Sequence, residues 1–250
     1  MTLTPFYPII KVERSFFMSV QTVTGVVNKA DLGITTPHEH IFIELTAFFE
    51  EHYVEDCESP STAYVTMDKL GILNRDPYAI RDNLSMLDYE TQKSEILRFK
   101  KAGGKTIVDA TLPGIGRNPE MLKKISEATG LNIVMGTGYY VYSTHPEEMK
   151  KMSEAEIADL MIKEIRDGVG NTGIKAGVIG EIGISEVFNE EERRVLKASA
   201  IAHKKTGVKI LVHINPWTIN GIEATQILLD AGVAPENIAI SHIDVANNEE

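Results

Sequence analysis

The chain has 250 residues and only one cysteine, Cys57. A single cysteine excludes an intrachain disulfide and favours a reducing, cytoplasmic location. Basic residues are also fewer than acidic ones. The sequence has 25 Lys and Arg and 36 Asp and Glu, so the formal net charge is -11. This charge disfavours binding to nucleic acid or to an anionic membrane surface. No apolar run is long enough to span a bilayer. The composition is typical of a soluble globular protein, and we expect its partner to be a small-molecule substrate.

The first residues do not resemble a signal peptide. A signal peptide places its positive charges before the apolar part, whereas here apolar residues such as Phe6 and Ile10 precede Lys11 and Arg14. Met18 comes directly after residue 17 and could be the first residue of the domain. We expect residues 1–17 to be an extension outside the fold, and residues 18–250 to form the domain.

Predicted strands and helices alternate over most of the chain. Residues 20–27 are rich in β-branched side chains and predict a short strand or hairpin. Residues 44–85 lack a clear period, and their aromatic residues favour an ordered lid or pocket wall. Further on, Asn118, Pro119 and Gly130 mark a helix start and stop. Six strands of continuous apolar residues are expected, ending near His40, Thr111, Thr137, Glu181, His213 and His242.

Buried parallel strands read as such apolar runs, and two α/β folds compete. A doubly wound nucleotide-binding fold should have a Gly-rich turn after its first strand. Here that position holds Pro37-His38-Glu39-His40. Polar residues at the carboxyl ends of strands are typical of a (β/α)₈ TIM barrel. We therefore predict an α/β TIM barrel, truncated to about six β/α units because two of the eight strands are not found.

Five residues form the predicted site. Alternate residues of a strand point to the same face, so His38 and His40 should project together and Glu39 away from them. Glu181, His213 and His242 each stand where a later strand should end. The carboxyl ends of barrel strands meet at one face, so these side chains should converge on the histidine pair.

Neutral imidazole and carboxylate groups bind Zn²⁺ and similar divalent ions. A central glutamate can bridge two ions, one on each oxygen. Two metal ions about 3.5–4 Å apart can share a hydroxide and polarise the bond that it attacks. The pattern predicts a divalent metal centre.

Other residues are weaker candidates, and an ordinary structural role is open for each. Asp109 and Asp244 could orient ligand histidines. His145, His52, Tyr139, Tyr140 and Trp217 are pocket-wall or loop candidates, His203 should be exposed on a helix, and Cys57 has no identifiable activating partner.

These residues together resemble a known family, the phosphotriesterase-related proteins of the amidohydrolase superfamily. The matching segments are residues 21–25, residues 33–40, residues 177–183, the strand ending at His213, and residues 241–244. The resemblance implies a (β/α)₈ barrel with a binuclear centre, most simply of two Zn²⁺ ions. It implies that His38 and His40 hold the more buried ion, that His213 and His242 hold the more exposed one, and that Glu181 is the bridging, catalytic carboxylate.

The chain departs from the family pattern in two ways. Organophosphate-cleaving members use a carboxylated lysine as the bridge, but Lys175 is at the opposite end of its strand, roughly 20 Å from position 181 at about 3.3 Å per residue. This resembles the glutamate-bridged branch. The family also carries an aspartate at the end of strand eight, which has no counterpart here.

Two functions follow as hypotheses. The first is a metal-dependent hydrolase, in which a metal-bridging hydroxide attacks an ester, lactone, phosphoester or N-acyl amide. The alternative is a catalytically inactive or truncated protein that binds a metal or another ligand. The open edge of the last strand could also pair with another chain, which is compatible with a homodimer.

Overall fold

A computed structural model describes residues 19–54 and 57–245. The expected extension, residues 1–17, lies outside the described residues, so it stays a prediction. The described chain begins with an antiparallel hairpin of β1 (Ser19–Thr22) and β2 (Gly25–Asn28). This confirms the hairpin expected there. The amide of Val23 donates to the carbonyl of Ile133 at 2.8 Å, which ties the hairpin to the central sheet.

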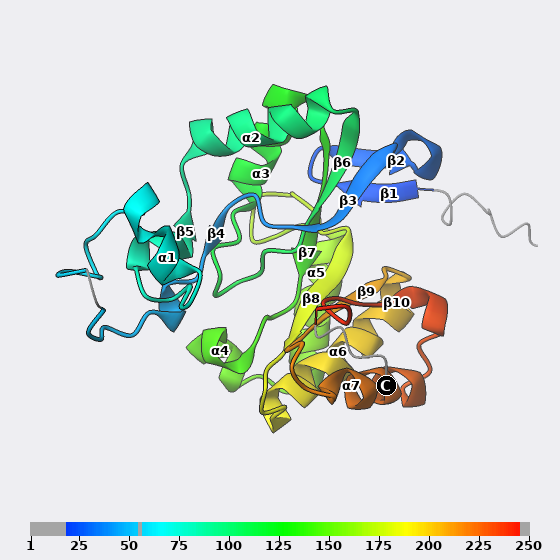
Figure 1. Ribbon diagram of the computed structural model, residues 1–250. Coiled ribbons are helices and arrows are strands. Elements are labelled where there is room, and N and C mark those ends of the chain that lie inside the picture. Colours follow the sequence, from blue (N-terminus) through cyan, green and yellow to red (C-terminus); the bar gives the residue numbers. More distant parts are fainter. Residues whose placement is uncertain (1–18, 55–56, 246–250) are drawn as a thin grey trace, which may run out of the picture.

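The central sheet has six strands, all parallel, in the order β10-β9-β8-β7-β6-β3. Within this sheet the strands follow one another in chain order, with the paired β4 (Ile43–Glu44) and β5 (Ser85–Met86) set apart between β3 and β6, and this order is the simple progression of a barrel. The strands are β3 (Ile34–Glu39), β6 (Gly104–Asp109), β7 (Asn132–Thr137), β8 (Val178–Ile184), β9 (Ile210–Ile214) and β10 (Ile238–Ile240). The sheet is curled (Figure 1), and the predicted fold, a (β/α)₈ barrel truncated to six units, is confirmed.

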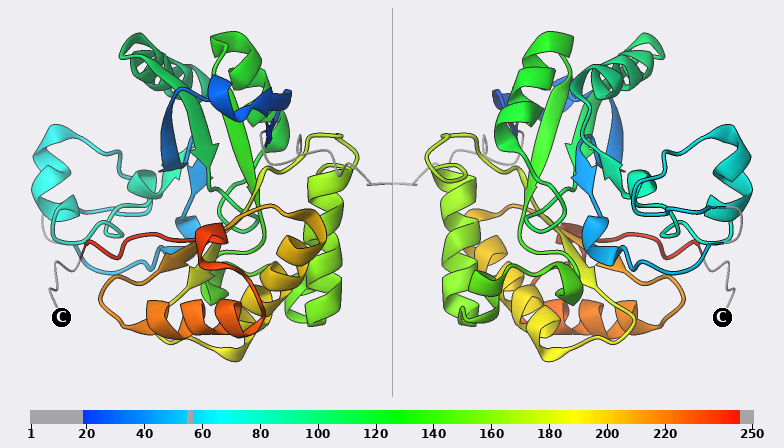
Figure 2. Two further views of the ribbon diagram at one scale, coloured as in Figure 1. Left: turned by 90° about the vertical axis from the view of Figure 1, so that its right-hand side faces the viewer. Right: turned by 90° about the vertical axis from the view of Figure 1, so that its left-hand side faces the viewer.

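Helices connect the strands and cover the outside of the sheet (Figures 1 and 2). They are α2 (Tyr89–Lys101), α3 (Pro119–Thr129), α4 (Glu147–Lys150), α5 (Glu154–Arg166), α6 (Glu190–Thr206) and α7 (Asn220–Asp230). Among the described residues, no helix combines the length and apolar character needed to cross a bilayer.

The helix boundaries follow the capping signals in the sequence. The side chain of Asn118 accepts from the amide of Met121, and Gly130 ends α3 in the left-handed conformation, with a φ of 69°. Ser153 and Glu156 form the expected capping box of α5. A side-chain acceptor of this kind is worth about 1 kcal/mol to a helix, because it satisfies an amide that has no partner inside the helix.

Two apolar clusters hold the helices against the sheet. One joins β8 and β9 to α5, α6 and α7 through side chains such as Ile179, Met161 and Leu196. The other joins β6 and β7 to α2 and α3 through side chains such as Ile133 and Ile125. Burial of an aliphatic side chain of this size contributes about 1.5–3 kcal/mol. The helices therefore keep the strands, and the side chains at the strand ends, in fixed relative positions.

The structure corrects two strand ends. β8 continues beyond Glu181 to Ile184, so Glu181 lies inside the strand. The strand can pass close to its neighbours here because Gly183 has no side chain, and a Cβ at this position would collide with the backbone of Tyr140. β10 ends at Ile240, so His242 lies just past it, in the left-handed region with a φ of 66°.

The region without a clear period forms a separate projection between β4 (Ile43–Glu44) and β5 (Ser85–Met86), which pair with each other. It contains α1 (Leu70–Leu73) and 3₁₀ turns at Thr46–Phe48, Met67–Lys69 and Arg81–Leu84. Its own small core includes Cys57, Leu73 and Ile80. The projection extends to one side of the sheet (Figure 1). The expectation of an ordered segment is confirmed for the described residues, and its role as a lid stays a prediction.

Candidate metal centre

His38 and His40 lie side by side at the end of β3. Their ring centroids are 5.4 Å apart, and both side chains are largely buried, whereas Glu39 between them is exposed. The alternation of the strand produces this arrangement. The structure therefore brings the two histidines together as the sequence predicts.

Glu181 lies at the centre of the site. Its side chain is 1% exposed, and three imidazoles surround its carboxylate. Oε2 lies 3.0 Å from Nε2 of His38 and 3.0 Å from Nδ1 of His213, and Oε1 lies 3.1 Å from Nε2 of His40. Both carboxylate oxygens are therefore engaged, Oε2 by His38 and His213 and Oε1 by His40.

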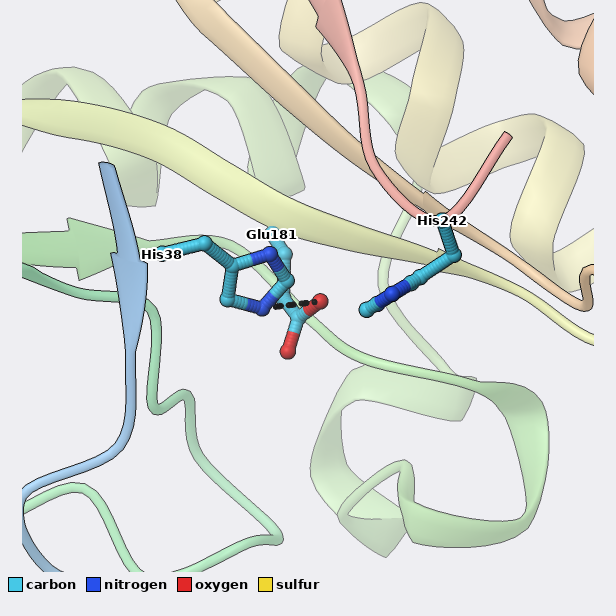
Figure 3. Close-up of side chains that lie close together, drawn as sticks. All are labelled: His38, Glu181 and His242. Carbon is cyan, nitrogen blue, oxygen red and sulfur yellow. Dashed lines mark ion pairs between the residues drawn. The ribbon is translucent and has the colours of Figure 1, made fainter. Parts of the chain in front are cut away.

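His242 completes the cluster from beyond the end of β10. Its ring centroid lies 5.1 Å from that of His38 and 4.7 Å from that of His213. Ligand atoms of His38, Glu181 and His242 all lie within 4.8 Å of one another. Figure 3 shows these three side chains pointing to the same place, His38 from β3, Glu181 from β8 and His242 from the segment just past β10. All five predicted site residues thus converge.

Two hydroxyl groups contact the Nδ1 atoms of the histidine pair, on the side of each ring that faces away from Glu181. Nδ1 of His38 lies 3.0 Å from Oγ of Ser241, and Nδ1 of His40 lies 3.0 Å from Oγ1 of Thr111. Each contact leaves Nε2 directed at Glu181. Hydroxyl or carboxylate partners of this kind orient metal-binding histidines. The sequence places Thr111 and Ser241 near strand ends, but it does not predict that they orient the histidines. Their positions in the sequence do not reveal which side chains their hydroxyls contact.

Tyr140 contacts the other side of the site. Its hydroxyl lies 3.0 Å from Nε2 of His213, and the two rings meet edge to face with centroids 4.7 Å apart. Burial, reinforced by the nearby charge of Glu181, raises the pKa of Tyr140, so the phenol stays neutral. Of the other aromatic candidates, Tyr139 is buried and Trp217 is 75% exposed.

Asp109 is fully buried beside the histidine pair, and its burial raises the pKa to about 6. Its carboxylate accepts from the amide of Ile41 at 2.8 Å and from the amide of Thr111 at 3.2 Å. Asp109 was a candidate for orienting a ligand histidine directly. In the structure Asp109 does not contact the ring of His40. Its carboxylate holds the backbone amide of Ile41, which follows His40, and the backbone amide of Thr111, whose hydroxyl contacts His40.

The cluster strongly perturbs its own ionisation. Burial is the largest influence on the pKa of Glu181 and raises it, but the hydrogen bonds from His213, His38 and His40 together outweigh burial and lower the pKa well below its usual value. The hydrogen bond to Glu181 raises the pKa of His38. Burial, followed by the charges of His213 and His38, lowers the pKa of His242. The centre therefore contains a stable carboxylate at neutral pH.

The remaining candidates lie apart from these contacts. Asp244 is exposed, and His52 forms an exposed pair with Asp76 at 3.4 Å. His203 is partly buried rather than exposed, since its Nδ1 lies 2.8 Å from the carbonyl oxygen of Val208. His145 is buried beneath the segment that carries Tyr140.

The donor set fits a divalent metal ion. Four imidazoles and one carboxylate are the nitrogen and oxygen ligands that Zn²⁺ and neighbouring transition metals prefer. The carboxylate has two oxygens among the imidazoles, so it could contact two ions. These residues therefore form a candidate metal centre at the carboxyl ends of the strands.

The fold and the cluster together define a β/α-barrel protein whose His-Glu cluster could hold a metal ion. Comparison with known proteins identifies the group more closely: the model of the phosphotriesterase family matches residues 18–250, and the chain belongs to this family.

Curated relatives and solved structures support this assignment. An N-acetyltaurine hydrolase of Danio rerio is 38% identical over 229 residues, which cover 90% of this chain and 64% of that protein. A phosphotriesterase-related protein of Nematostella vectensis is 39% identical, with 90% and 65% covered. The crystal structure of a resiniferatoxin-binding protein from Rhodobacter sphaeroides has a TM-score of 0.88 and 31% identity, with 91% and 63% covered. The chain thus spans somewhat less than two thirds of the length of these relatives.

Proposed function

We propose that this chain carries the binuclear metal centre of a hydrolase, and that the substrate is an N-acyl amide of the N-acetyltaurine type. The observation that carries the proposal is the position of Glu181, whose two carboxylate oxygens lie about 3 Å from three imidazoles. In this assignment His38 and His40 would hold one ion, His213 and His242 would hold the other, and the carboxylate of Glu181 would be a ligand of both. The relatives named N-acetyltaurine hydrolase support the choice of substrate.

Two bound ions, most simply Zn²⁺, would ionise a water near neutral pH and polarise the carbonyl group under attack. The protein's own part is to orient the ligands. Thr111 and Ser241 fix the two rings of the histidine pair through Nδ1. The neutral phenol of Tyr140 can donate one hydrogen bond at the rim of the site, because its hydroxyl faces His213.

The overall reaction would transfer the acyl group to water. A bond forms between the oxygen of water and the acyl carbon, the bond from this carbon to nitrogen breaks, and the nitrogen takes up a proton and leaves as the amine. N-Acetyltaurine would thus yield acetate and taurine. An ester, a lactone or a phosphoester would react at the same site by the same attack.

The test is a substrate comparison on the zinc-loaded chain. Amine or acid release is measured from N-acetyltaurine, an aliphatic lactone, an aryl ester and a phosphotriester, for wild type and for Glu181→Gln. We expect the highest kcat/KM with N-acetyltaurine and a loss of about a hundredfold or more in the variant, as for removal of a key electrostatic group. Equal rates in wild type and variant would contradict the proposal.

One observation favours a second candidate, a binding protein without turnover. The structure with a TM-score of 0.88 carries the name of a resiniferatoxin-binding protein. The two candidates differ in what the substrate comparison would show. A chain that binds zinc and N-acetyltaurine tightly, but releases no taurine, would support the binding function.

A further inference from the structure

The first turn of α6 holds the segment that carries Tyr140. Two carboxylates of this turn face the segment. Oε1 of Glu192 accepts from the amide of Tyr142 at 2.9 Å, and Oε2 of Glu191 lies 3.3 Å from Nδ1 of His145. Glu192 is fully buried, and the side chain of His145 is 0% exposed. These groups lie outside the metal centre, and the proposed function does not use them.

His145 links the α6 turn to Tyr140 directly. Its Nε2 lies 2.8 Å from the carbonyl oxygen of Tyr140. The ring also packs edge-on against Tyr139 and Tyr142, with centroid distances of 6.1 Å and 6.4 Å. A chain of contacts therefore runs from Glu191 through the imidazole to the backbone of Tyr140, and from the phenol of Tyr140 to His213.

Both ring nitrogens of His145 face oxygen acceptors. A main-chain carbonyl has no hydrogen to donate, and neither has an ionised carboxylate. A neutral imidazole has one N–H, whereas the imidazolium has two. The 2.8 Å contact with the carbonyl of Tyr140 therefore places a hydrogen on Nε2, which donates to that oxygen, while Nδ1 faces Glu191.

We propose that His145 is a positioning residue for the metal centre. Paired with Glu191, it fixes the carbonyl of Tyr140 and thereby holds the phenol against His213. This inference rests on the proposed function for its effect on turnover, but the contact itself exists without metal. A displacement of about 1 Å at such a position can cost up to about a hundredfold in rate.

The test compares substitutions that keep different parts of the ring. The amide nitrogen of His145→Gln occupies the place of Nε2 and keeps the donor to Tyr140. His145→Asn places its amide nearer Nδ1 and keeps only the contact toward Glu191. His145→Phe keeps the approximate size of the ring and loses both ring nitrogens. Circular dichroism establishes that each variant is folded, and the Gln–Asn pair suffices if the Phe variant is not.

The first measurement uses metal-free full-length chain with ¹⁵N-labelled histidine. The Nε2 signal of His213, assigned by its loss in His213→Gln, should move when the phenol is removed in Tyr140→Phe. We expect it to move in the same direction in His145→Phe and His145→Asn, and to stay at the wild-type position in His145→Gln. A wild-type signal in His145→Asn and His145→Phe would overturn the proposal, whatever the activity of the chain.

The second measurement is kcat of the zinc-loaded chain. His145→Asn should lower kcat by about ten- to a hundredfold with little change in KM, and His145→Gln should restore most of it. In a Tyr140→Phe background the same substitution should have little further effect, because the group that it positions is already absent. Independent, multiplicative losses would show a merely structural role. A wild-type chain without turnover would refute the proposed function and leave the spectroscopic result to decide the role of His145.

Discussion

Nε2 of His38, on the first strand of the sheet, lies 3.0 Å from Oε2 of Glu181, on the fourth. The two strands are not neighbours, so this contact depends on the curl of the sheet. The end of β10 closes in from the other side, where Ser241 reaches His38. The cluster is thus formed by strands from both ends of the sheet. The residues that hold its side chains in place can be substituted one at a time.

The hydroxyl of Thr111 should matter for metal affinity. It holds Nδ1 of His40, and loss of such a partner typically costs about 10- to 100-fold in metal binding. Thr111→Val keeps the shape and removes the hydroxyl, so zinc affinity measured by competition with a chelating dye should fall within this range. Thr111→Ser is the matched control and should bind nearly as well as wild type. Equal affinity in all three chains would contradict the assigned role.

Asp109 should make the metal-free chain less stable as the pH rises from about 4 to about 6. Burial raises its pKa from 3.8 to about 6 in the folded chain. The folded state therefore holds the proton more tightly, which adds stability at low pH that is lost as the pH rises through the folded value. The difference between these two pKa values corresponds to about 3 kcal/mol of unfolding free energy, at about 1.4 kcal/mol per pKa unit.

The variant Asp109→Asn cannot ionise, and this provides the measurement. Urea unfolding at several pH values should show that the stability of the variant relative to wild type improves between pH 4 and pH 6 and then stays constant. A relative stability that does not change with pH in this window would show that Asp109 titrates normally.

The buried ion pair of Arg117 and Glu164 should be essential to folding stability. The guanidinium contacts both carboxylate oxygens, at 2.6 Å and 2.7 Å, and the two side chains are 6% and 9% exposed. Glu164→Leu removes the charged partner of the buried guanidinium and leaves it, among the described residues, only the carbonyl of Gly136, at 3.2 Å, so we expect a loss of about 3–5 kcal/mol in urea unfolding. The double variant with Arg117→Met should recover much of this loss. Glu95→Gln is the control, because Glu95 pairs with Arg98 at 3.1 Å on the exposed surface of α2, and it should change stability little.

Gly183 should be sensitive to the smallest substitution. A Cβ at this position would collide with the backbone of Tyr140 and Val141, so Gly183→Ala must displace the segment that contacts His213. Overpacking of this kind costs about 1–3 kcal/mol, and turnover should also fall. The control is Gly71→Ala, where a Cβ meets no atom within 4 Å. Similar melting temperatures for the two variants would refute the close approach.

Much of the fold could be predicted from local patterns. Apolar runs marked the six strands, and Asn118, Pro119 and Gly130 marked α3, because capping and turn chemistry act over a few residues. The exact ends were less certain. β8 passes beyond Glu181 because Gly183 lets a neighbouring backbone approach, and the sequence alone does not say which neighbour will lie there.

The five ligand candidates could also be predicted from the sequence, since parallel strands bring their ends to one face. The residues that orient these ligands could not be predicted. Thr111, Ser241 and His145 act through hydrogen bonds between residues far apart in the chain, and a hydroxyl or an imidazole has many ordinary roles. Only the three-dimensional arrangement distinguishes these residues from others of the same type.

Metal content is the most direct test of the proposal that Glu181 is a shared ligand of two metal ions. Elemental analysis would be made on the purified wild-type chain, on Glu181→Gln, and on Glu39→Gln, which alters the exposed carboxylate between the two histidines. We predict about two zinc-like ions per chain in wild type and in Glu39→Gln, as in two-metal sites, and a sharp fall in Glu181→Gln. A folded wild-type chain without metal, or a variant at position 181 with the full content, would contradict the claim.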